Sequence, residues 1–68
     1  MKPVSGRRMC QALEASGWTL ARIEGSHHVD LRDDSPRNIS VPVHGNRDLK
    51  PGTQRIVMRM AGLTDADL

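Results

Sequence analysis

The hydrophobic positions near the N-terminus predict an amphipathic helix. Met9 and Leu13 recur at the spacing of one helix face, with polar and charged residues between and around them. Ser5 precedes them and suits an N-cap, because its hydroxyl can accept a hydrogen bond from a free N–H of the first turn. Gly17 can end the helix in the left-handed conformation. We therefore expect a helix from about Ser5 to Ser16.

Three short segments that follow alternate between polar and apolar residues, as half-buried strands do. They read TLARIE, HHVDLR and ISVPV, and the turn-forming run DDSPRN separates the last two. Pro42 has no N–H to donate, so its strand is expected at a sheet edge or with that nitrogen toward solvent. The pattern predicts a three-stranded antiparallel meander with one apolar face.

A second helix is expected after the loop HGNRD, because Pro51 suits a first helical turn. Gly62 would end this helix, and Thr64 with Asp67 has the spacing of a capping box for one further turn. The apolar stripe expected to face the core consists of Ile56, Val57, Met60 and Leu63. The predicted order is α-β-β-β-α, an α+β fold with two helices on one face of the sheet.

The length of 68 residues predicts one domain spanning 1–68. A chain this small buries only about 60% of the surface that its unfolded form exposes, so we expect a shallow surface site and no cofactor cradle. Cys10 is the one cysteine, which excludes an internal disulfide and fits a reducing cytoplasm. No apolar run is long enough for a signal peptide or a membrane span.

The basic residues are mostly arginines, and the formal net charge is +2. Guanidinium groups bind phosphate oxygens in pairs, so this composition favours a nucleic-acid partner, although a solvated arginine-rich surface is the equal alternative. The residues expected to hold phosphate lie at the starts of the two helices and on the first strand: Arg7, Arg8, Arg22, Lys50 and Arg55. They would form a phosphate-binding rim only if one edge of the fold gathers them.

Two adjacent histidines open the second predicted strand, in the stretch GSHHVDLR. Neighbouring residues of a strand face opposite sides. His27 has the parity of Val29 and Leu31, so we expect it on the helix-covered side, and we expect His28 with Asp30 on the open face. This arrangement disfavours one metal ion shared by both histidines, and no nearby carboxylate spacing completes a metal site.

A histidine in a basic protein can cleave RNA without a metal ion. Imidazole exchanges a proton near neutral pH and can take one from the 2′-hydroxyl, whose oxygen then attacks the adjacent phosphorus. Positive groups stabilise the charge that develops on the phosphoryl oxygens. DNA lacks the 2′-oxygen and is excluded as a substrate of this route. The alternative is that these histidines, and His44 in the following loop, only form ordinary hydrogen bonds.

Three stretches of the chain together resemble the HicA family of small toxins: SGRRMCQALEASGW, GSHH and VPVHGNRDLKPGTQRIVMRMAGLT. The resemblance implies a fold like that of double-stranded-RNA-binding domains. It implies a cytoplasmic, metal-independent endoribonuclease toxin of a type II toxin–antitoxin system, which cleaves mRNA, inhibits translation and acts in stress responses. It also implies a HicB-type antitoxin that masks the toxin in a hetero-oligomeric complex.

The family's catalytic histidine, in its Gly-Ser-His motif, corresponds to His27. Members differ in which of the two adjacent positions carries the histidine, so His28 is the alternative. Two residues depart from the family pattern, because Asp30 stands where many relatives carry an aromatic residue and Gln54 stands where a leucine is usual. The rival interpretations are a double-stranded-RNA-binding module that does not cut, and a protein-interaction module of the same fold.

Overall fold

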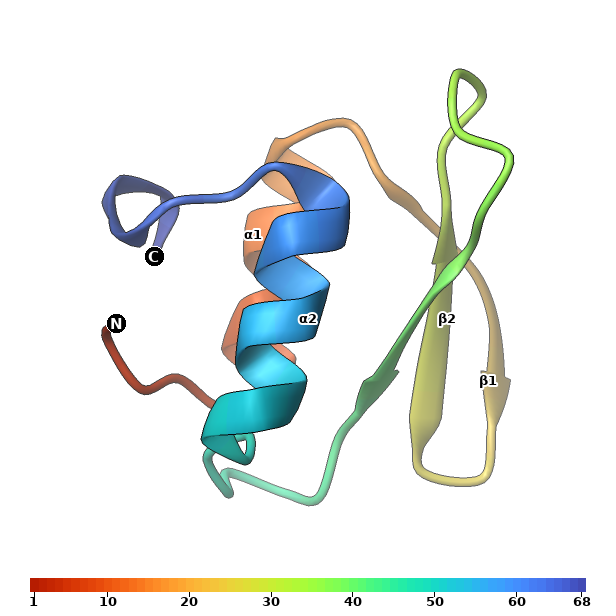
Figure 1. Cartoon of the computed structure of the whole chain (residues 1–68). Coiled ribbons are helices and arrows are strands. Elements are labelled where there is room, and N and C mark those ends of the chain that lie inside the picture. Colours follow the sequence, from red (N-terminus) through yellow and green to blue (C-terminus); the bar gives the residue numbers. More distant parts are fainter.

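A computed structural model describes all 68 residues, in the predicted order α-β-β-β-α. Both helices lie on the same side of a three-stranded antiparallel sheet (Figure 1). The elements are α1 (Gly6–Ala15), β1 (Thr19–Glu24), β2 (His27–Leu31), β3 (Ile39–Pro42), α2 (Pro51–Ala61) and a 3₁₀ turn, η1 (Asp65–Asp67). The predicted α+β fold is confirmed.

Local signals determine both ends of α1. The Ser5 hydroxyl accepts a hydrogen bond from the backbone N–H of Arg8 at 3.0 Å, as an N-cap does. At the other end Gly17 has φ of 97°, which a residue with a side chain rarely adopts, and Trp18 N–H donates to the Leu13 carbonyl at 3.0 Å. These bonds turn the chain back toward the sheet and place the Trp18 ring in the core.

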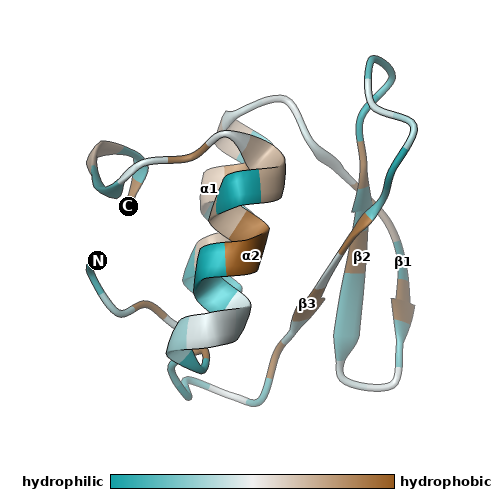
Figure 2. Cartoon of the chain, viewed as in Figure 1, coloured by the Kyte–Doolittle hydropathy of each residue, from teal (hydrophilic) through white to brown (hydrophobic).

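The ends of α2 also match the prediction, but its buried face matches only in part, because Val57 and Leu63 are in the core as expected while Ile56 and Met60 are not. Pro51 is the first residue, Gly62 ends the helix with φ of 70°, and Thr64 and Asp67 form the capping box. The residues of α2 that face the core are Gln54, Val57 and Met58. Ile56 and Met60 remain 60% and 41% exposed, so the expectation of a core stripe through them is wrong. Apolar residues are therefore exposed on α2 together with polar ones, and Figure 2 shows how hydrophobic and hydrophilic residues mix along this helix.

The hydrogen bonds of Gln54 explain why this residue, and not Ile56, faces the core. Its side-chain oxygen accepts from Val4 N–H at 3.3 Å, and its side-chain nitrogen donates to the Lys2 carbonyl. A buried amide is tolerated where its hydrogen bonds are made. The segment before α1 is thereby attached to α2, and Gln54 replaces the apolar contact that Ile56 was expected to make.

β2 is the central strand, so β1 and β3 are the sheet edges, and Pro42 lies on an edge strand as predicted. The pairing of β1 with β2 shifts between Leu20 and Arg22, where Ala21 is the extra residue. The helices contact β3 most extensively, and α1 also contacts β1 (Figure 1).

The two faces of β2 are the reverse of the expectation. Ile39 and Val41 of β3 are buried in the core under the helices, and their partners on β2 are Asp30 and His28. Cross-strand partners share a face, so His28 and Asp30 face the helices and His27 lies on the open face. The apolar parity of Val29 and Leu31 was misleading, because the register with β3 decides which side is covered. Leu31 is in fact 43% exposed.

The start of α1 packs tightly against the end of β3. A Cβ on Gly6 would overlap the carbonyl oxygen of Pro42, so only glycine fits here without a shift of the backbone. Pro42 is the cross-strand partner of His27. The close approach therefore brings the N-terminal turn of α1 toward the end of the sheet that carries the histidines.

Candidate active site

His27 begins β2 directly after the tight turn through Gly25, which has φ of 60°, and Ser26. Its side chain is exposed on the open face of the sheet. The ring nitrogen Nδ1 lies 3.1 Å from Oγ of Ser40 on the neighbouring strand β3. Nε2 has no partner within the protein, so the imidazole is held at one nitrogen and available to solvent at the other.

This contact suits proton exchange at Nε2. When Nδ1 carries the proton and donates to Ser40, Nε2 presents a lone pair that can accept a proton. When the Ser40 hydroxyl donates to Nδ1, Nε2 carries the proton and can give it away. A neutral imidazole alternates between these arrangements without a change of ring position, as a general base that later acts as a general acid requires.

His28 occupies a different environment on the opposite face. It is partly buried, its cross-strand partners are Val41 on β3 and Ile23 on β1, and its side chain makes no hydrogen bond within the protein. The two histidines therefore cannot act on one group at the same time. No cluster of three or more His, Cys, Asp or Glu side chains is placed to hold a metal ion.

Asp30 is the most unusual residue near the histidines. It is 0% exposed, and neither carboxylate oxygen has a hydrogen-bond partner. Burial raises the pKa of Asp30, the negative charge of Glu14 raises it further, and His28 lowers it. Burial, Asp30 and Glu14 also raise the pKa of the Cys10 thiol to about 11. Cys10 is therefore a neutral thiol at physiological pH and no nucleophile.

Two of the five basic residues expected at the site are engaged within the protein. The guanidinium of Arg8 donates to the carbonyl oxygen of Leu68 at 3.1 Å, which attaches the C-terminal segment to α1. Nε of Arg22 pairs with Glu24 at 3.0 Å, and Glu24 is the cross-strand partner of His27. Arg22 thus lies on the same open face as His27, but beside a carboxylate.

The other three, Arg7, Lys50 and Arg55, are exposed and make no side-chain hydrogen bond or ion pair. They do not form one continuous rim. Lys50 lines a hollow at the end of β3, whereas Arg55 lines a separate hollow beside η1 together with Arg59.

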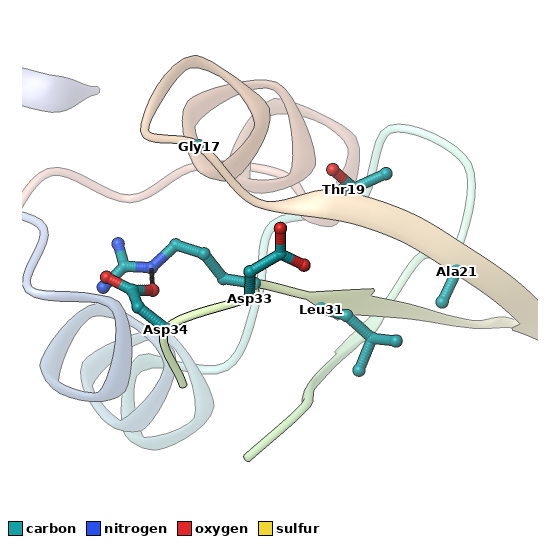
Figure 3. A pocket seen from close by; sticks show the side chains of 7 residues that line it. Gly17, Thr19, Ala21, Leu31, Asp33 and Asp34 are labelled. Carbon is teal, nitrogen blue, oxygen red and sulfur yellow. Dashed lines mark hydrogen bonds and ion pairs between the residues drawn. The ribbon is translucent and has the colours of Figure 1, made fainter. Parts of the chain in front are cut away.

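The largest hollow, of about 470 Å³, lies beside Thr19 and Leu31 (Figure 3). Leu31 ends β2 and the histidines begin it, so this hollow is at the opposite end of the strand from them. Its lining includes Thr19, Leu31, Asp33 and Asp34, and its one cation is Arg32. Arg32 is paired with Asp34 and stacked over the Trp18 ring at 5.1 Å. The lining thus carries two carboxylates and a single guanidinium, which is already paired with one of them. This balance of charge disfavours a phosphate ligand here.

A second hollow, of about 400 Å³, lies at the end of β3. It is lined by Pro42, His44, Arg47, Asp48, Leu49, Lys50 and Thr53. Pro42 is both a wall of this hollow and the cross-strand partner of His27. The candidate site therefore consists of an exposed, oriented imidazole and a basic hollow whose wall includes the cross-strand partner of that histidine.

A family model described as the HicA toxin of bacterial toxin–antitoxin systems matches residues 6–63. The chain belongs to the HicA toxin family. The match runs from the first residue of α1 to Leu63 and includes both histidines and the whole sheet, which confirms the resemblance found in the sequence. A search of curated protein sequences gives no match.

Membership places the chain among the toxins of toxin–antitoxin systems. No helix of this HicA toxin is long and apolar enough to cross a membrane. Sequence reasoning missed two residues of the site, Ser40 and Arg47. The polar position of Ser40 between two apolar residues placed it on one face of its strand, but only the register with β2 brings it to His27.

Proposed function

We propose that this HicA toxin is a metal-independent endoribonuclease that cleaves mRNA and so inhibits translation, with His27 as its proton-transfer residue. The observation that carries the proposal is the His27 imidazole, which is exposed on the open face and held at Nδ1 by Ser40. Family membership supports the same activity.

In the proposed reaction, Nε2 of His27 takes the proton of an RNA 2′-hydroxyl. The 2′-oxygen forms a bond to the adjacent phosphorus, and the bond from phosphorus to the 5′-oxygen of the next nucleotide breaks. The leaving oxygen takes a proton from the imidazolium or from water. The products are a 2′,3′-cyclic phosphate and a 5′-hydroxyl, and nearby cations stabilise the charge on the phosphoryl oxygens.

The environments of the two histidines support His27 over His28. His28 is partly buried on the helix-facing side of β2, where the helices limit the approach of an RNA strand. Asp30 on the same side is a carboxyl group that would repel phosphate when ionised. His28 remains the alternative proton-transfer residue, and single substitutions separate the two.

The decisive experiment measures cleavage of a defined mRNA by the purified chain in excess chelator. We expect full activity with chelator, a loss of roughly 10²–10⁴-fold in His27→Ala, and a far smaller loss in the control Arg37→Ala, whose side chain is exposed in the loop before β3. Activity that disappears with chelator, or that persists at the full rate in a His27→Ala, His28→Ala double variant, would contradict the mechanism. Tight binding of double-stranded RNA without cleavage would favour a binding module instead.

We further propose that the toxin acts in the cytoplasm and that a HicB-type antitoxin binds it in a hetero-oligomeric complex that masks His27. Toxin–antitoxin membership supports a protein partner. Expression of the chain should arrest growth, and co-expression of a HicB-like protein encoded beside it should relieve the arrest. Growth arrest that the His27→Ala variant also causes would contradict the proposal.

A further inference from the structure

We propose that the hollow at the end of β3 binds the RNA backbone phosphate next to the one that His27 attacks. The hollow is formed by Pro42, His44, Arg47, Asp48, Leu49, Lys50 and Thr53 and is called here the β3–α2 hollow. The inference rests on the proposed ribonuclease function, because it takes RNA as the ligand. It adds a second point of contact, and it assigns Arg47 to the site.

The position of the hollow follows from the sheet register. His27 and Pro42 are cross-strand partners, so their Cα atoms lie roughly 4.5–5.5 Å apart and their side chains share the open face. The backbone N–H of Val43 donates to the Ser26 carbonyl at 2.7 Å, which attaches the chain entering the hollow to the turn before His27. A strand of RNA placed across His27 therefore reaches the β3–α2 hollow next.

The charges in the hollow favour an anion. Arg47 and Lys50 are exposed, and neither side chain forms a hydrogen bond or an ion pair. Asp48 is the one carboxylate of the lining and is also without an ion pair. Two unpaired cations against one carboxylate leave a positive hollow, and the His44 ring and the Thr53 hydroxyl add hydrogen-bond donors for phosphate oxygens.

The other hollows do not offer this combination. The hollow beside Leu31 holds two carboxylates, and its single cation is already paired. The hollow that contains Arg55 and Arg59 lies along the rest of α2 and beside η1. Arg59 is nine residues beyond Lys50, or about 14 Å along the helix axis, because each residue adds about 1.5 Å. Of the three hollows, the β3–α2 hollow is the one whose wall includes the partner of His27.

The test uses a short 2′-O-methyl oligoribonucleotide, which keeps the phosphates but has no 2′-hydroxyl to attack. Its affinity for the chain is measured as a function of salt concentration. For a single strand, each phosphate contact contributes about 0.7 to the slope of log K against log salt concentration, or about fivefold in affinity between 1 M and 0.1 M salt. Arg47→Gln and Lys50→Gln should therefore each weaken binding about fivefold at about 0.1 M salt. Asp48→Asn should tighten binding. Arg37→Gln is the matched control, since Arg37 is also exposed but lies in the loop before β3.

The outcomes separate this inference from the proposed function. If the chain cleaves RNA but Arg47→Gln and Lys50→Gln bind the oligonucleotide as tightly as Arg37→Gln does, the hollow is not the subsite and the ribonuclease proposal stands. If the chain neither cleaves RNA nor binds the oligonucleotide, both fail. Cleavage gives an independent readout: Arg47→Gln should raise KM with kcat little changed, because a contact made equally before and during the reaction contributes uniform binding.

Discussion

Nδ1 of His27 lies 3.1 Å from Oγ of Ser40, across the boundary between β2 and β3. The two residues are not direct partners, because His27 pairs with Pro42 and Ser40 pairs with Val29. The contact is therefore a diagonal one on the open face. It fixes the ring orientation and leaves Nε2 as the nitrogen that meets solvent.

Ser40→Ala should slow RNA cleavage without unfolding the chain. A hydrogen bond of this kind contributes about 0.5–1.5 kcal/mol, so the loss of orientation should reduce kcat roughly 2- to 10-fold. Ser40→Thr keeps the hydroxyl and should restore most of the rate. Initial rates over a range of pH check this, because a role in orienting the imidazole should also alter the pH profile. Equal rates and superimposable profiles for Ser40→Ala and the unaltered chain would exclude the role.

The helix ends were predictable because their signals are local. Ser5, Gly17 and Gly62 each act within a few residues of their own position, through one hydroxyl or one left-handed conformation. A hydrogen bond to a neighbouring turn depends little on the rest of the fold. The sequence alone therefore predicted where both helices begin and end.

The faces of β2 and α2 were not predictable, because distant segments decide them. The alternation of β2 does not decide which of its two faces the helices cover. Asp30 faces the helices because it pairs with the buried Ile39 of β3. The burial of Gln54 depends on backbone groups at Lys2 and Val4, far away in the sequence. The contact of His27 with Ser40 likewise depends on the register, so the sequence indicated His27 as a candidate but not the residue that holds its ring.

Asp30→Asn should make the stability of the chain less dependent on pH. Burial and the charge of Glu14 raise the folded-state pKa of Asp30 above its unfolded value. The contribution of Asp30 to stability is therefore full below the unfolded pKa and is lost as pH rises through the folded pKa. Asparagine does not ionise, so Asp30→Asn avoids this loss. Its free energy of unfolding, measured relative to that of the unaltered chain, should therefore increase between pH 4 and pH 7. The gain is about 1.4 kcal/mol for each unit by which folding raises the pKa.

Urea unfolding at several pH values measures this effect. Glu14→Gln is the comparison variant, because it removes only the second cause of the raised pKa and should reproduce a smaller part of the change. Stability curves for Asp30→Asn and the unaltered chain that run parallel from pH 4 to pH 7 would contradict the assignment.

Gly6→Ala should destabilise the fold at the junction of α1 and β3. The added Cβ would overlap the Pro42 carbonyl oxygen, and backbone atoms cannot rotate away as a side chain can. We expect a loss of about 1–3 kcal/mol in the free energy of unfolding, typical of overpacking. Gly52→Ala is the matched control, because nothing lies within 4 Å of its Cβ position in the first turn of α2. It should be neutral or stabilising by up to about 1 kcal/mol, as measured by urea unfolding.

Gln54→Leu should destabilise the chain. Leucine would leave the buried Val4 N–H without its acceptor and the Lys2 carbonyl without its donor. An unsatisfied buried group costs about 1–3 kcal/mol, which the gain in apolar contact offsets only in part. Amide hydrogen exchange at Val4 should also become faster, because the segment before α1 loses its attachment to α2.

Ile56→Gln is the control on the same helix, since Ile56 is 60% exposed and its replacement should change stability by no more than about 0.5 kcal/mol. Unchanged exchange at Val4 in Gln54→Leu would show that the N-terminal segment is held by other contacts.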